Sequence, residues 1–137
     1  AYCTFEVGER MIDRGDGGVI LSMGATNSVR GAPYYAHSGA GKAGVHNLMQ
    51  SVAAEWARYG IRANTIAPGV IRTEGVMEVM DEATAEQLIE EDLAADRLGT
   101  PADCVPMTVF LASPAASYVT GSYFVVDGGQ LLSPVPG

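Results

Sequence analysis

The spacing of apolar residues predicts helices and strands that alternate along the chain. Residues 1–14 have a loosely helical spacing, and residues 38–59 form the strongest predicted helix, which Gly60 ends. Short β-branched or alternating runs predict strands over residues 19–23, 61–67 and 123–126. The first strand, the long helix and the second strand have the length of one right-handed βαβ unit. We therefore expect an α/β fold with a parallel sheet.

The segment after the second strand has a different character. Residues 73–96 hold nine acidic residues and no basic one, together with one apolar stripe. We expect residues 74–98 to form a mobile helical lid that faces solvent. Thr100 followed by Pro101 predicts another helix start, with Thr100 as the N-cap. The apolar tail, residues 131–137, is expected to pack against a partner or to trail free.

Composition and charge narrow the classes of function. The 137 residues are 47% hydrophobic, which suits one globular domain, and the net charge is −8. This acidity argues against nucleic acid or an anionic membrane face as a partner, because both require a basic patch. No run of about 18 apolar residues is present. Cys3 and Cys104 are far apart, which fits a reducing cytoplasm and no metal or disulfide framework.

One motif resembles a phosphate-binding loop but stands in the wrong context. Residues 39–44 read G-x-G-x-x-G, yet the nearest predicted strand ends some sixteen residues earlier. A dinucleotide loop needs a strand directly before it, so that its backbone N–H groups face the pyrophosphate. We interpret Gly39, Gly41 and Gly44 as allowing the helix start to approach another backbone or a cofactor.

Several motifs together resemble the short-chain dehydrogenase/reductase family. They are the run AHSGAGKAGVHNLMQSVAAEWARYGIRANTIAPGVIRTEG and the endings SPAASYVTG and VVDGG, in the family's order. The resemblance covers residues 1 to 129. It implies the C-terminal half of a doubly wound, Rossmann-like parallel sheet, so that residues 1–137 form a partial domain. The chain opens inside a helix at Ala1, which suggests a fragment. The family's TGxxxGxG loop would precede it, and we expect the chain alone to be inactive.

The resemblance assigns catalytic roles to Lys42 and Ser38, which lie four residues apart on one helix face. In the family the Lys ammonium holds the nicotinamide ribose. Most members have Tyr where this chain has Ser38. The wording around it is most similar to trans-2-enoyl-CoA and 2,4-dienoyl-CoA reductases, which tend to lack that Tyr. Reduction of a conjugated C=C tolerates this change, since the thioester oxygen needs only hydrogen-bond donors.

The remaining candidates are weighed against simpler structural roles. Thr26 and Asn27 are further candidate donors, and Tyr34 or Tyr35 could supply a phenol if the loop is reshaped. Ser38 could instead be only the helix N-cap. The sequence of residues 68–73 matches PGxxxT, which implies that Pro68, Gly69, the backbone at Val70 and Ile71, and the Thr73 hydroxyl bind the nicotinamide. His46 is expected on the outer helix face, and His37 and His46 do not form a metal site.

The resulting prediction is an oxidoreductase that uses NADP or NAD and reduces an enoyl or dienoyl thioester of a small-molecule substrate such as an acyl-CoA. The alternatives are a carbonyl or alcohol dehydrogenase of the same family and a non-catalytic fragment that oligomerises. A homo-oligomer is expected, because the small-residue helix and the last strand are surfaces that the family uses for assembly. A serine hydrolase is disfavoured, because no G-x-S-x-G turn is present.

Overall fold

A three-stranded parallel sheet forms the centre of the computed structural model, which describes residues 1–132. Strands β1 (Gly18–Met23), β2 (Ile61–Pro68) and β3 (Tyr123–Val126) lie in the order β1-β2-β3. Gly18 pairs with Ile61 and Thr65 with Tyr123. The predicted α/β fold with a parallel sheet is confirmed, and each predicted strand lies within one residue of its observed bounds.

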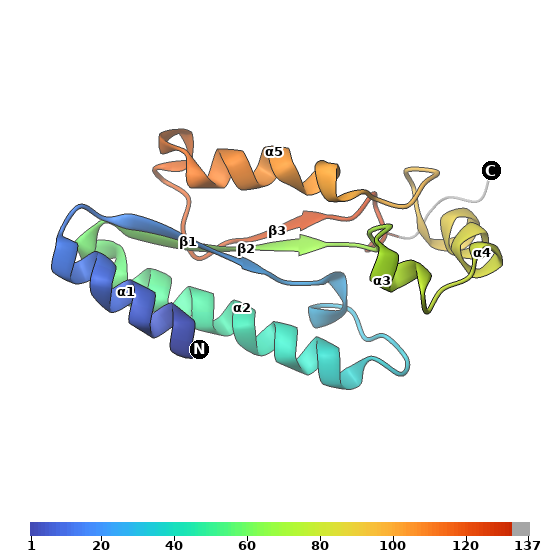
Figure 1. Ribbon diagram of the computed structural model, residues 1–137, viewed down its shortest axis with the longest axis horizontal. Helices are drawn as coiled ribbons and strands as arrows, with labels where there is room; N and C mark the ends of the chain where they lie inside the picture. The colour runs from blue at the N-terminus through green and yellow to red at the C-terminus, as the bar shows by residue number, and fades with distance from the viewer. Residues whose placement is uncertain (133–137) are drawn as a thin grey trace.

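Helices cover both faces of this sheet (Figure 1). Helices α1 (Tyr2–Arg14) and α2 (Ala36–Trp56) lie on one face, and α5 (Pro101–Ala112) lies on the other. Three short 3-10 turns complete the framework: η1 (Thr26–Ser28), η2 (Ala57–Tyr59) and η3 (Pro114–Ala116). The middle strand is therefore shielded from both sides, and Ala63 and Ile66 on it are fully buried.

The core consists of one apolar cluster on each side of the sheet. On the α1 and α2 side, Trp56 packs edge-on against Phe5, with ring centroids 6.1 Å apart. Gly8 is buried beneath this indole, where an added Cβ would lie 2.3 Å from the ring. On the other side, Leu111 of α5 is fully buried against Ile66. Val109 and Phe110 of the same helix are exposed.

The predicted start of the last helix is confirmed in detail. Thr100 is the N-cap of α5 and Pro101 is its first residue. The Asp103 carboxylate accepts hydrogen bonds from the Thr100 backbone N–H and hydroxyl, at 2.7 and 2.8 Å, and so closes a capping box. Arg97 also donates two hydrogen bonds to Asp103. The hydrogen bonds from Arg97, followed by those from Thr100, hold the pKa of Asp103 far below its usual value.

The acidic segment forms two short helices beyond the carboxyl ends of β2 and β3 (Figure 1). These are α3 (Glu74–Met77) and α4 (Glu82–Asp92). The predicted apolar stripe is only partly correct: Leu93 is buried with Ala85 and Leu98, whereas Val79 is 80% exposed. Of the tail, residues 133–137 lie outside the described part. None of the helices over residues 1–132 has the length and apolar character of a membrane span.

Candidate functional site

The carboxyl ends of the three strands and the amino end of α2 meet at one edge of the molecule (Figure 1). This is the edge at which open α/β sheets usually bind ligands, because the loops there converge above the strands. The loop after β1 carries η1, which packs against the start of α2. The turns after β2 and β3 lie beside it, since the Gly69 N–H donates to the Val126 carbonyl at 3.0 Å.

Lys42 lies in the second turn of α2, and its ammonium reaches back to the end of β1. Lys42 Nζ donates a hydrogen bond of 2.8 Å to the Met23 carbonyl. An ammonium has three N–H donors, so two others are available to a ligand at this edge. The side chain is only partly exposed. The structure therefore fixes the positive charge beside the loop that carries η1 and does not release it into open solvent.

Ser38 and Asn27 form a hydrogen-bonded pair between α2 and η1. Asn27 Nδ2 donates to Ser38 Oγ at 3.3 Å, which leaves the Ser38 hydroxyl proton free to be donated elsewhere. Asn27 Oδ1 is buried and accepts no hydrogen bond within residues 1–132. The helix begins at Ala36 with Tyr35 as its N-cap, so the interpretation of Ser38 as the N-cap is wrong.

A glycine lets these two elements come together. Gly39 is buried, and a Cβ built on it would lie 2.6 Å from the Asn27 carbonyl oxygen. No real Cβ tolerates that separation, so the close approach of α2 to η1 requires glycine here. Gly41 and Gly44 behave differently, since an added Cβ at either position would meet no atom of the described chain within 4 Å. The predicted close approach is thus confirmed for Gly39 only.

Gln130 connects η1 to the turn after β2. The Thr26 hydroxyl donates to Gln130 Oε1 at 3.2 Å, so its single proton is already engaged. The same Oε1 lies so close to Gly69 that a Cβ there would come within 2.9 Å of it. The turn that carries Gln130 is held by Asp127, whose carboxylate accepts from the backbone N–H groups of Gly129 and Leu131.

The turn at residues 68–73 leaves two backbone N–H groups without a hydrogen bond in the described part of the chain. The Val70 carbonyl accepts from Gly99 N–H, and Arg72 N–H donates to the Gly99 carbonyl. Among the hydrogen bonds of residues 1–132, none uses the N–H of Val70 or Ile71. The Thr73 hydroxyl accepts from Val76 N–H as the N-cap of α3, yet its own proton remains available.

The two alternative phenols lie outside this constellation. Tyr34 has a positive φ of 67° and a side chain that is 97% exposed. Tyr35 is also exposed. No hydrogen bond in the described part of the chain connects either hydroxyl to Ser38, Asn27 or Lys42. The shape of the loop therefore favours Ser38 and Asn27 over these tyrosines.

Sequence reasoning misplaced His46 and missed Tyr123. His46 does not lie on the outer helix face, because its Nδ1 lies 3.2 Å from Thr65 Oγ1 on the central strand. Its ring also packs edge-on against Tyr123, with centroids 4.6 Å apart. Tyr123 follows η1 by about a hundred residues, so no local spacing could have connected them. Among the described residues, no group of His, Cys, Asp or Glu could hold a metal.

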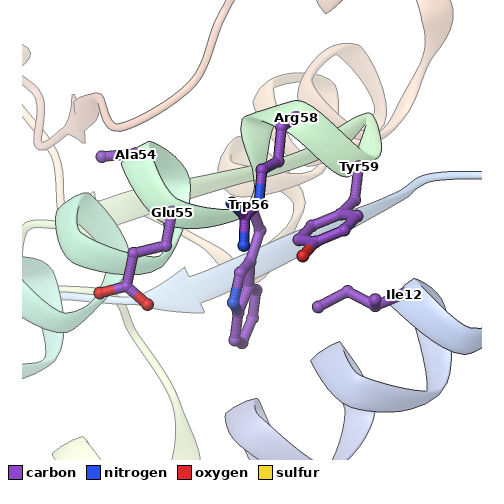
Figure 2. A pocket seen from close by; sticks show the side chains of 6 residues that line it. All are labelled: Ile12, Ala54, Glu55, Trp56, Arg58 and Tyr59. Atoms are coloured by element: carbon purple, nitrogen blue, oxygen red, sulfur yellow. The ribbon is translucent and has the colours of Figure 1, made fainter.

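One cavity lies away from this edge. It has a volume of about 390 Å³ between α1 and the carboxyl-terminal end of α2, and Figure 2 shows the side chains around it. Its lining residues are Ile12, Ala54, Glu55, Trp56, Arg58 and Tyr59. A smaller cavity of about 200 Å³ adjoins the Val70–Ile71 turn and Gly128 at the candidate site.

Comparison with known proteins gives consistent matches over nearly the whole chain. A sequence model of the family described as "Enoyl-(Acyl carrier protein) reductase" matches residues 1–130. A probable 2,4-dienoyl-CoA reductase of Bacillus subtilis is 39% identical over 98% of this chain and 54% of its own length. An L-rhamnose 1-dehydrogenase of Sphingomonas is 38% identical over 91% of this chain and 49% of its own length. The chain thus spans about half the length of these curated relatives.

Solved structures agree with these matches. A gluconate 5-dehydrogenase of Burkholderia cenocepacia, in complex with NADP and tartrate, is 36% identical with a TM-score of 0.87. The match covers 93% of this chain and 50% of that one. A 4-hydroxyisoleucine dehydrogenase mutant complexed with NADH and succinate is 32% identical with a TM-score of 0.91, over 98% and 55% of the two chains.

Proposed function

Because the chain belongs to the short-chain dehydrogenase/reductase family, we propose that it carries the catalytic half of an NAD(P)H-dependent reductase of 2-enoyl or 2,4-dienoyl thioesters. The Ser38–Asn27 pair beside Lys42 is the observation that carries this proposal. It offers neutral hydrogen-bond donors at the position where most family members have a phenol. The matches to dienoyl-CoA reductases support the same substrate class.

The residues at the carboxyl edge fit a nicotinamide cofactor, either NADP or NAD. Lys42 would hold the ribose hydroxyls with its two available N–H donors, while the free N–H groups of Val70 and Ile71 and the Thr73 hydroxyl would hold the carboxamide. Pro68 and Gly69 set the course of this turn, and Gly69 admits no side chain there. When bound, the cofactor supplies the hydride.

The proposed work of the protein groups is to hold negative charge on the thioester oxygen. Ser38 donates its hydroxyl proton as a hydrogen bond, and Asn27 fixes the direction of that proton by occupying a Ser38 lone pair. Ser38 keeps its own proton in this scheme, and the proton that the α-carbon of the enolate must gain comes from water. One such preorganised donor contributes about 10²- to 10³-fold to kcat.

We propose a structural role for Thr26 at this site. Its proton points to Gln130, so it presents only lone pairs to a ligand. It therefore differs from Ser38, although both were candidate donors. We propose that Thr26 keeps η1 against the cofactor turn and that Asn27 and Ser38 face the substrate.

Further parts of the proposal concern the whole protein. Residues 74–98 would act as a substrate lid, since α4 ends at Asp92, whose carboxylate lies 3.7 Å from Arg30 of the η1 loop. Activity would require a dinucleotide-binding half in addition to the described residues, so that the chain alone is inactive. A homo-oligomer and a cytoplasmic location are proposed as well, the latter because Cys3 and Cys104 are both free.

A carbonyl or alcohol dehydrogenase is the second candidate. The likeness to an L-rhamnose 1-dehydrogenase and to a gluconate 5-dehydrogenase favours it directly. Reduction of a carbonyl places a proton on the oxygen itself, and that demands a stronger acid than a serine hydroxyl. A serine at position 38 therefore favours reduction of a C=C over reduction of a carbonyl.

The deciding experiment measures NADPH and NADH oxidation by the protein together with its dinucleotide-binding half. We expect turnover with crotonyl-CoA or a 2,4-dienoyl-CoA and little with ketones or sugars. Ser38→Ala should lower kcat about 100-fold. Ser51→Ala is the matched control, because Ser51 lies on the same helix and, within residues 1–132, its hydroxyl bonds only to the Asn47 carbonyl. Turnover of sugars but not thioesters would replace the proposal with the second candidate.

A further inference from the structure

Tyr123 of β3 contacts the η1 turn through its hydroxyl group. The Tyr123 hydroxyl donates a hydrogen bond of 2.5 Å to the Ala25 carbonyl and also contacts the Ser28 hydroxyl. Ala25 and Ser28 are the residues directly before Thr26 and directly after Asn27. The Tyr123 hydroxyl therefore contacts both ends of the turn that carries Thr26 and Asn27.

The hydroxyl protons of Tyr123 and Ser28 are both used within this contact. Ser28 Oγ also lies 2.8 Å from the Ala25 carbonyl, so Tyr123, Ser28 and Ala25 form a triangle of polar contacts. The two hydroxyl protons can satisfy two of its three sides at one time. Neither hydroxyl then has a proton left for a substrate. The triangle orders the turn and takes no direct part in chemistry.

The ring of Tyr123 is itself anchored in the rigid part of the fold. It packs edge-on against His46 of α2, and His46 Nδ1 contacts Thr65 Oγ1, which in turn lies 2.9 Å from Ser22 Oγ. Gly24 borders the ring, since a Cβ there would lie 3.1 Å from Tyr123 Cε2. All three strands and α2 thus contribute to fixing the phenol.

We propose that Tyr123 is a positioning residue, whose hydroxyl fixes the η1 turn so that the Asn27 amide meets Ser38. The inference rests on the proposed function, because it assigns Tyr123 an effect through Asn27 and not through the substrate. Without the hydroxyl, the Ala25 carbonyl keeps the Ser28 N–H and hydroxyl as partners within the turn but loses its hydrogen bond to β3, so the turn can shift relative to the sheet. A shift of a fraction of an ångström would lengthen the 3.3 Å contact between Asn27 and Ser38.

The test compares Tyr123→Phe with Tyr118→Phe in the complete protein. Both changes remove one hydroxyl, but the Tyr118 side chain is fully exposed. Tyr123→Phe should lower kcat about tenfold with no change in the KM for NADPH, because misplaced catalytic groups cost rate more than binding. Ser28→Ala, which keeps the Tyr123 ring and its hydroxyl, should act in the same direction. In an Asn27→Ala background, Tyr123→Phe should have no further effect on kcat.

A second measurement does not depend on activity. The side-chain amide resonances of Asn27 should shift and exchange faster with solvent in Tyr123→Phe and stay unchanged in Tyr118→Phe. Unchanged resonances, or an equal loss of kcat in the Asn27→Ala background, overturn the positioning role alone. If Asn27→Ala itself leaves kcat unchanged, the proposed site is wrong and the role of Tyr123 falls with it.

Discussion

At the scale of single residues, hydrogen-bond geometry separates side chains that look equivalent in the sequence. Ser38 and Thr26 both carry a hydroxyl near η1, yet only Ser38 has its proton free. The same accounting applies to Asp103, whose carboxylate is surrounded by donors from Arg97 and Thr100. The ionised carboxylate accepts all of these hydrogen bonds, and protonation weakens them, so the stability of the start of α5 depends on pH.

Replacing Asp103 should change how stability depends on pH. Its pKa is lower in the folded than in the unfolded chain, so the unfolded state binds the proton first as pH falls. The contribution is complete above the unfolded pKa of about 3.9 and is lost as pH falls through the folded pKa. We expect thermal melts of Asp103→Asn to lie below wild type near neutral pH, with a gap that begins to narrow below about pH 4 and closes only as pH falls through the much lower folded pKa.

The control is Glu86→Gln, which removes an exposed carboxylate that takes part in no ion pair within residues 1–132. Its melting temperature should follow wild type at every pH. A gap between wild type and Asp103→Asn that stayed constant from neutral to acidic pH would contradict the capping role of the charge.

The candidate residues could be predicted from the sequence only where their motif is local. Ser38 and Lys42 share one helix, and residues 68–73 share one turn, so the family resemblance could assign them from short contiguous motifs. His46 was misplaced because its partner Thr65 lies on β2, nineteen residues later in the sequence. Tyr123 and Gln130 act on η1 from about a hundred residues away, and only the parallel register brings them there.

At the scale of elements, the contact between the first turn of α2 and η1 controls the site. Gly39 presses its backbone against the Asn27 carbonyl, whereas Gly41 faces open space in the described chain. The strands were predictable because buried parallel strands form short apolar runs between turn signals. Helices α3 and α4 were harder to predict from the sequence, because they are short and largely exposed, which weakens the periodic spacing of apolar residues.

Alanine at these two glycines should have opposite effects on stability. Both substitutions gain helix propensity, and Gly41→Ala should stabilise the chain by about 0.5 to 1 kcal/mol. Gly39→Ala adds a clash at 2.6 Å with Asn27 and should destabilise it by about 1 to 3 kcal/mol. Urea unfolding of both variants measures the difference. Equal stabilisation by both would show that α2 and η1 are not in contact.

At the scale of the whole molecule, we propose that the described residues supply one end of a cofactor site. The nicotinamide partners proposed here come from α2 and from the turn after β2. The G-x-G-x-x-G sequence lies inside α2 and follows no strand directly, so it offers no phosphate cradle. Binding of a dinucleotide therefore requires further groups for its adenosine and pyrophosphate parts.

The isolated 137-residue chain should accordingly show no thermal stabilisation by NADPH or NADH. A ligand that binds only the folded state raises the melting temperature by an amount that grows with the ratio of its concentration to its Kd. We expect a shift within error at millimolar cofactor for the isolated chain and a clear increase when the dinucleotide-binding half is present. A clear shift for the isolated chain would contradict the division of the site.

We propose that Lys42 and the turn at Pro68 lie on two sides of one nicotinamide pocket. A crystal structure of the complete protein with NADPH tests this most directly. The account predicts Lys42 Nζ within about 3 Å of the ribose hydroxyls, with the carboxamide bound to the N–H groups of Val70 and Ile71. A nicotinamide bound elsewhere, with Lys42 still directed only at the Met23 carbonyl, would contradict it.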